Sequence, residues 1–433
     1  MSTLLMHPRG GVPEVLSSPD DIAAAADFLA SGEGPLAVDT ERAGSYVYDD
    51  RAQLIQVRRH GAGTFLLDPE SVPGAIGEIV PVMNTIPWIL HAAASDLPSL
   101  NALGMSPPNL FDTEIAGRLL GIQKVNLAAL TEEFLGTTLA KGHGRENWAT
   151  RPIPDTWRTY AALDVELLPE LSAVLSDTLA EMGRLDWLID ETDALLHIHE
   201  PAATPLPGGN HHVSIENAPE DAWRGLKGIG RLRSPEQLVI AREMWTERDR
   251  LARRDDVAPT SILPHSVIVE AARVRASDQR DLAAVHGFPS RRRGATTHWS
   301  RVITSALATP RDSWPTQLKV DSIGGHRPHH RDWPEKAPAA SATLEVVAEA
   351  VSFEADQLGI DSGMLLPSKG IRSLAWELSA DALQPLDTDA TVREYLRNYG
   401  VRPWQEDILT GLVDRAVLLP RRQARTNNPR VSE

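Results

Sequence analysis

The alternation of apolar and polar positions divides the chain into a first part with strand and helix patterns and a second part with helical patterns only. Apolar runs of strand length occur in PLAVDTE (35–41), AQLIQVRR (52–59), TFLLDP (64–69) and IPWILHA (86–92). Helical periodicity marks residues 20–30, several stretches after residue 95, and a last long stretch over 154–183. Three strands in succession, followed by alternation with helices, predict a mixed sheet that is covered by helices.

Beyond about residue 200 the strand patterns end. Residues 234–256 and 265–275 predict helices, which begin at Ser234-Pro235 and after Pro264. Two parts of this helical region resemble each other, because residues 247–273 and 354–376 both contain a helix, a loop ending in Leu-Pro and a second helix. The region is therefore predicted to hold two related helical domains.

Segments rich in proline and glycine suggest where the domains end. The predicted division is an α/β domain (1–200), a linker (201–214), a helical domain (215–312), a second linker (313–341), a second helical domain (342–420) and a disordered tail (421–433).

Charge is distributed unevenly along this chain of 433 residues, whose net charge is −16. Residues 221–331 hold 20 Lys and Arg against 12 Asp and Glu, a local charge of +8, which leaves −24 for the remainder. An acidic part joined to a basic part suits an enzyme that holds a polyanion. Ordinary solvated arginine faces would give the same count.

Composition narrows the cellular setting of the chain. It contains no cysteine, which excludes disulfides and thiolate metal sites. We find neither a secretory signal nor a run of about 20 apolar residues, the length that a membrane span needs. We therefore expect a soluble cytoplasmic protein without a membrane partner.

Three sequence segments place acidic residues where the predicted sheet ends. Asp39 and Glu41 close a strand and point to the same face, because side chains alternate along a strand. Asp96 follows the strand at 86–92, and Tyr160 and Asp164 lie one helical turn apart. Each segment alone has an ordinary explanation: a solvated turn, a helix N-terminal charge, or a packed tyrosine. Together they predict an all-oxygen site for two divalent cations, Mg²⁺ or Mn²⁺.

These segments resemble the three motifs of the DEDD superfamily of exonucleases. DTE, the Asp of HAAASDL and YAALD match in order, and Tyr160 identifies the tyrosine branch, since Thr159 stands where the other branch has histidine. FDTEIAGRLLG, LTEEFLGTTLAKG and RENWATRP follow the order seen in ribonuclease D. Residues 221–290 resemble the HRDC domain of that family, and the last block resembles a second, degenerate copy.

The resemblance implies an RNase H-like exonuclease domain followed by two all-α HRDC-type domains. It also implies metal-dependent hydrolysis of RNA 3′ ends to nucleoside 5′-monophosphates, with single-stranded ends of tRNA precursors as the expected partners and a monomer as an acceptable state. Asp39, Glu41 and Asp164 would hold the cation that activates water, and Asp39 would also reach a second cation. Asp96 would act through bound waters, and Tyr160 would orient the attacking water.

Other residues are weaker candidates. Seven arginines of the helical region are candidates for phosphate contacts, with an ordinary surface role as the alternative: Arg231, Arg233, Arg250, Arg253, Arg254, Arg273 and Arg275. His91 suits a core position better than a substrate contact, and Trp148 could stack on a base or fill the loop. It stays open whether the loop after Glu41 receives the RNA 3′ end.

Two rival functions remain at this point. A DNA 3′–5′ exonuclease would use the same acids, because no motif here reveals a contact to the 2′-hydroxyl group. An RNA-binding adaptor with a silent exonuclease fold would lack one of the motif acids, and none is missing.

Overall fold

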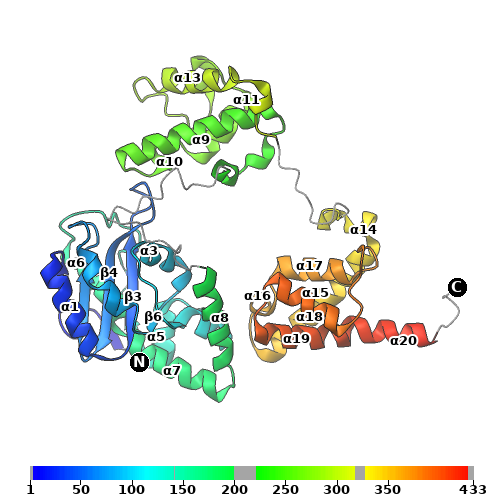
Figure 1. The fold of residues 1–433 in the computed structure, drawn as a ribbon, viewed down its shortest axis with the longest axis horizontal. Coiled ribbons are helices and arrows are strands. Elements are labelled where there is room, and N and C mark those ends of the chain that lie inside the picture. Colours follow the sequence, from blue (N-terminus) through cyan, green and yellow to red (C-terminus); the bar gives the residue numbers. More distant parts are fainter. Residues whose placement is uncertain (1–2, 141, 199–220, 317–326, 428–433) are drawn as a thin grey trace.

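A computed structural model describes residues 3–140, 142–198, 221–316 and 327–427 (Figure 1). These residues form an α/β domain (3–198), a first helical domain (221–316) and a second helical domain (327–427). Among the described helices none is long and apolar enough to cross a membrane. The predicted linker 201–214 lies outside the described residues.

A six-stranded mixed sheet forms the centre of the α/β domain and confirms the predicted class. Its order is β2 (Val15–Leu16), β5 (Gly63–Leu67), β4 (Ala52–His60), β3 (Glu33–Arg42), β6 (Trp88–Leu90) and β7 (Leu110–Asp112). β4 runs antiparallel to both its neighbours, and the other pairs are parallel. A separate parallel pair joins β1 (Thr3–Leu5) to β8 (Thr137–Leu139).

Helices cover both faces of this sheet, and strand β3 supplies side chains to each. Leu36 and Val38 of β3 pack with Ile22 and Leu29 of α1 (Pro19–Ser31). On the other face Ala37 packs with Val165 of α6 (Asp155–Glu166) and with Leu168 of α7 (Leu168–Glu181). The odd-numbered side chains of β3 therefore face α6.

The long helix predicted over residues 154–183 is instead two helices. α6 ends at Glu166 and α7 begins at Leu168, with Leu167 between them. Pro169 explains the break, because proline has no N–H and its ring clashes with the carbonyl group four residues earlier. A further helix, α8 (Leu185–Ile198), completes the α/β domain.

The first helical domain is built around α9 (Pro235–Asp255). Ser234 and Gln237 form a capping box at its start, which confirms the predicted start signal. Four further helices surround a core that includes Trp223, Ile268 and Trp299: α10 (Pro259–Ile262), α11 (His265–Val274), α12 (Gln279–Ala284) and α13 (Ala295–Leu307).

The second helical domain repeats the beginning of the first, as predicted. α15 (Pro338–Leu358) is a 21-residue helix like α9, and α16 (Ser362–Leu365) is a four-residue helix like α10. Pro367 then caps α17 (Ser368–Leu378) as Pro264 caps α11. The remaining helices are α18 (Asp389–Tyr399), α19 (Pro403–Val413) and α20 (Leu419–Asn427), with a π-helical turn at Asp414–Leu418 before α20.

Two predicted irregular segments are partly helical. The predicted linker 313–341 contains α14 (Trp333–Lys336) and the start of α15, because Trp333 is buried against Trp376. The predicted disordered tail 421–433 is wrong for residues 421–427, which complete α20 and extend from the domain in Figure 1. Arg421 anchors this helix by donating a hydrogen bond to the carbonyl oxygen of Leu378.

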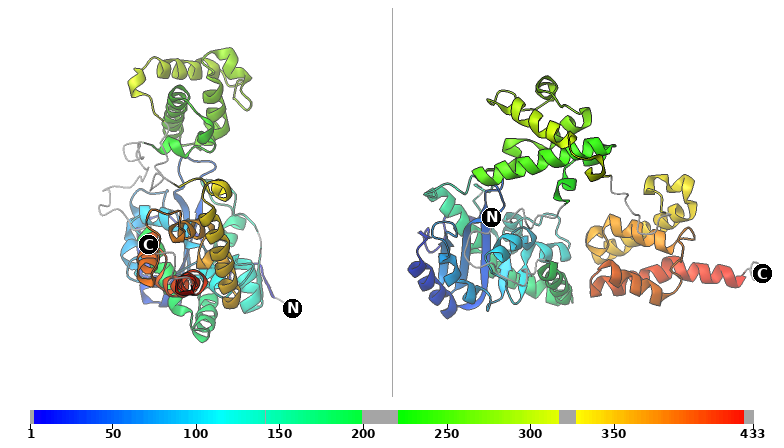
Figure 2. Two further views of the ribbon diagram at one scale, coloured as in Figure 1. Left: turned by 90° about the vertical axis from the view of Figure 1, so that its right-hand side faces the viewer. Right: turned by 45° about the horizontal axis from the view of Figure 1, so that its top comes forward.

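The two helical domains join the α/β domain in different ways. The second shares one apolar core with it, in which Leu119 and Leu175 pack with Val347 and Leu409. The first meets it at the loop between β3 and β4 (Figure 2). There the backbone N–H of Ala258 donates a hydrogen bond to the carbonyl oxygen of Tyr46. The contact between the first helical domain and this loop is mainly polar.

Candidate active site

Three of the predicted acids meet where strand β3 passes under helix α6. Asp39 and Glu41 lie on the face of β3 opposite to Val38, and Asp164 projects from α6 toward them. One carboxylate oxygen of each residue lies within 4.8 Å of the others. Side-chain alternation in the strand and the position of α6 on that face together create this acidic triad.

The acidic triad is electrostatically strained without a cation. Burial and the neighbouring carboxylates Asp164 and Asp96 raise the pKa of Glu41 to about 9. Burial raises the pKa of Asp164 to about 7. Burial and the neighbouring carboxylates also raise the pKa of Asp39 well above its usual value. Among the described residues no ion pair joins the triad to a lysine or arginine. An oxygen-only site with uncompensated charge fits a hard divalent cation.

Asp96 stands beside the triad but is held by other groups. It follows β6, next to the end of β3, and only 3% of it is exposed. Its Oδ1 accepts hydrogen bonds from Thr40 (2.6 Å) and Arg42 (2.9 Å). Its Oδ2 accepts one from the Ser95 hydroxyl group (2.9 Å). The structure thus places the fourth acid near the triad, with its oxygens already occupied.

Tyr160 lies one turn before Asp164 on α6, and its hydroxyl group is close to that carboxylate. Burial and the nearby acids raise the pKa of Tyr160, so the phenol stays protonated and can donate a hydrogen bond. The backbone of the preceding loop approaches closely, because a Cβ atom at Gly144 would lie 3.3 Å from the hydroxyl oxygen.

The structure also decides the two weaker candidates in this domain. Trp148 is fully buried, with its ring 5.3 Å from that of Trp157, so it fills the loop. His91 is hydrogen-bonded to the Thr113 hydroxyl group (2.9 Å), and burial lowers its pKa to about 4. His91 is therefore a neutral, satisfied histidine beside the core.

An open groove of about 630 Å³ reaches the triad at Glu41. The end of β3, the loop after it and residues 144–146 form its walls, and Arg42 and Arg145 are its cationic side chains. Gly44 and Tyr46 line it as well. This loop is thus placed to contact a chain end that reaches Glu41.

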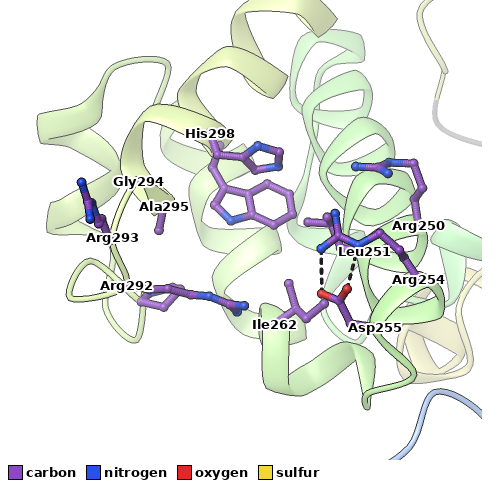
Figure 3. Close-up of a pocket in the computed structure, with 12 residues that line it drawn as sticks. Arg250, Leu251, Arg254, Asp255, Ile262, Arg292, Arg293, Gly294, Ala295 and His298 are labelled. Atoms are coloured by element: carbon purple, nitrogen blue, oxygen red, sulfur yellow. Dashed lines mark hydrogen bonds and ion pairs between the residues drawn. The ribbon is translucent and has the colours of Figure 1, made fainter.

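The seven candidate arginines do not form one surface. Arg250 and Arg254 line a pocket of about 270 Å³ in the first helical domain, together with His298 (Figure 3). Arg254 pairs with Asp255, and Arg250 pairs with Glu247. The remaining candidates lie elsewhere: Arg253 covers the ring of Tyr48, Arg273 pairs with Glu270, Arg275 pairs with Glu236, and Arg231 and Arg233 lie near the start of α9.

Two further arginines of this pocket were missed by sequence reasoning. Both lie in the segment before α13; the side chain of Arg292 reaches toward Arg254, whereas that of Arg293 lies at the edge of the pocket and points away from it (Figure 3). The run SRRRG at 290–294 directly before a helix was the available signal. We now regard this arginine pocket (Arg250, Arg254, Arg292 and Arg293) as the best phosphate-binding candidate in the helical region.

Three family models match the chain. The model described as 3′–5′ exonuclease matches residues 13–180, and the HRDC domain model matches residues 237–295. The model described as 3′ to 5′ exonuclease C-terminal domain matches residues 326–417. The second helical domain is thus matched by a model of its own, which begins within the predicted second linker.

Individual proteins resemble the chain over most of its length. A ribonuclease D of Pseudomonas paraeruginosa is 28% identical over 369 residues, covering 84% of this chain and 89% of that protein. The crystal structure of a protein from Bifidobacterium adolescentis is 33% identical, with a TM-score of 0.80, covering 96% of this chain and 100% of that one. The structure of Escherichia coli RNase D shares the fold at 22% identity, with a TM-score of 0.65, covering 93% and 99%.

Proposed function

Because this chain belongs to the ribonuclease D family and is a 3′–5′ exoribonuclease, we propose that it trims structured RNAs such as tRNA precursors with the help of two divalent cations. The observation that supports this proposal is the acidic triad of Asp39, Glu41 and Asp164, with Tyr160 beside it. The products would be nucleoside 5′-monophosphates, released one at a time.

The donor set suits the proposed cations. Asp39, Glu41 and Asp164 would hold the first, and Asp39 and Asp96 would serve the second, Asp96 through bound waters. Divalent cations at such a site supply an activated water and neutralise charge on the phosphate. The raised pKa values of the triad support this assignment, because a bound cation would replace the protons that the free acids keep.

The other residues of the site would orient the RNA. The protonated hydroxyl group of Tyr160 points to Asp164 and could hold the attacking water in line with the phosphate. The groove past Gly44 and Tyr46 would receive the last nucleotides. The arginine pocket would hold the backbone farther from the 3′ end, by contacts that do not depend on base sequence.

Substitution of one triad acid tests the proposal. We expect Asp39→Asn to lower mononucleotide release from 3′-labelled RNA more than about 100-fold, because even outer-shell partners of a metal cost about 10–100-fold. The matched control is Asp27→Asn, which changes an exposed acid on α1 and should leave activity unchanged. A fully active Asp39→Asn enzyme would contradict the proposal.

The same assay separates the rival functions. A chelator should stop the release, and Mg²⁺ or Mn²⁺ should restore it. Preference for a DNA substrate of the same sequence would favour a DNA exonuclease. Binding of RNA without any release, under all metal conditions, would favour a silent adaptor.

A further inference from the structure

Arg42 places a fixed positive charge at the edge of the candidate cation site. It directly follows Glu41, where the pairing of β3 with β4 changes register. Its side chain turns toward the end of β6, where Nη1 donates to Asp96 Oδ1 (2.9 Å) and to the carbonyl oxygen of Ser95. Only 22% of this side chain and 5% of that of Asp96 are exposed, so the ion pair is largely shielded from water.

The four acids of the site therefore fall into two classes. Asp96 has one cationic partner and two hydroxyl donors, which occupy both of its oxygens. Burial raises the pKa of all four acids, but among the described residues only Asp96 forms an ion pair with an arginine. A cation that enters the RNA-free site gains most at the triad and least at Asp96.

We propose that Arg42 is the counter-cation of Asp96 in the RNA-free enzyme, so that this enzyme binds one divalent cation, at the triad, until RNA draws Arg42 away. Arg42 is a positioning residue in this scheme, because it acts through Asp96. The inference rests on the proposed cation site and adds an order in which the cations bind.

The groove gives Arg42 an alternative partner. Arg42 and Arg145 both line it, so a phosphate of an entering RNA strand would come within reach of the Arg42 guanidinium group. Guanidinium groups bind phosphate oxygens through paired hydrogen bonds. A phosphate would therefore compete strongly with Asp96 for Arg42. RNA and the second cation would then strengthen each other's binding, because such a coupling is reciprocal.

Counting bound Mn²⁺ on the full chain tests this inference without measuring activity. Equilibrium dialysis and electron paramagnetic resonance should give one Mn²⁺ per wild-type chain in the absence of RNA. Saturating amounts of an uncleavable phosphorothioate oligoribonucleotide should raise the number to two. Arg42→Gln should bind two without RNA, and Arg145→Gln, which removes the other arginine of the groove, should still bind one.

The outcomes separate this inference from the proposed function. Two Mn²⁺ on the RNA-free wild type, or one on a folded Arg42→Gln variant, would overturn the role of Arg42 and leave the cation site intact. A wild type that still binds one Mn²⁺ with RNA bound would overturn it too, even if Arg42→Gln does not fold. A wild type that binds no Mn²⁺ at all would contradict the proposed function itself.

Discussion

The hydroxyl group of Tyr48, in the loop after β3, donates a hydrogen bond to Asp249 of α9 (2.9 Å), while Arg253 of the same helix lies 5.0 Å from the tyrosine ring. The same loop carries Tyr46 and Asp50 in the wall of the groove. One short segment therefore lines the path to the triad and also holds the first helical domain in place.

Removing that hydroxyl group should impair RNA processing without unfolding the protein. A net hydrogen bond contributes about 1 kcal/mol, so Tyr48→Phe should lower kcat/KM for long RNA roughly fivefold. Tyr399→Phe is the matched control, because its ring stacks on Tyr395 in the second helical domain. Steady-state kinetics on both variants checks this, and equal kcat/KM values would show that the contact does not position the domain.

The raised pKa values of the triad predict how stability depends on pH. The folded protein keeps protons on Glu41 up to about pH 9 and on Asp164 up to about pH 7, whereas the unfolded chain releases them near their usual values of 4.5 and 3.8. The free energy of unfolding contributed by these groups therefore falls as pH rises through that window. In chelator, the Tm should be lower at about pH 8 than at about pH 6.

Mg²⁺ should reverse this loss, and its stabilising effect should be larger at the higher pH. Asp164→Asn removes one of the titrating groups, so the metal-free variant should show a smaller decrease in Tm between the two pH values. Thermal unfolding followed by circular dichroism measures both effects. If the variant shows the wild-type pH dependence of the Tm, Asp164 does not contribute to it.

The arginine pocket should contribute to the salt dependence of RNA binding. Each phosphate contact with single-stranded RNA contributes about 0.7 to the slope of log K against log salt, so Arg292→Gln combined with Arg293→Gln should reduce the slope by about 1.4. Arg273→Gln is the control, since Arg273 pairs with Glu270 outside the pocket. An unchanged slope in the double variant would mean that these arginines do not meet phosphates.

The contact between the α/β domain and the second helical domain should be important for stability. Trp404 of α19 stacks on Trp187 of α8 at 4.5 Å and donates a hydrogen bond to Glu191 (3.1 Å). Trp404→Ala should cost about 3–5 kcal/mol, because it leaves a cavity in a shared core. Leu383→Ala, at a position that is 78% exposed, should change little. Urea unfolding of the two variants measures the difference.

Sequence patterns predicted those features of the molecule that depend on residues close together in the sequence. Alternation along β3 placed Asp39 and Glu41 on one face, and Ser234 with Gln237 marked a helix start. Strand β7 was not predicted, because its apolar run consists only of Leu110 and Phe111 before Asp112. The pairing of Arg42 with Asp96, 54 positions apart, and the arginine pocket depend on how distant segments pack, which no window of sequence contains.

The apolar core shared by the α/β domain and the second helical domain has a consequence for how the protein is synthesised. Leu119, Leu175 and Leu188 of the α/β domain leave the ribosome long before Val347 and Leu409, which cover them in the finished molecule. Domains generally fold in the order of their synthesis, so this apolar surface stays uncovered while the first helical domain is translated. A nascent chain stopped before α15 should therefore bind chaperones that recognise exposed apolar segments, and release them once α19 has emerged.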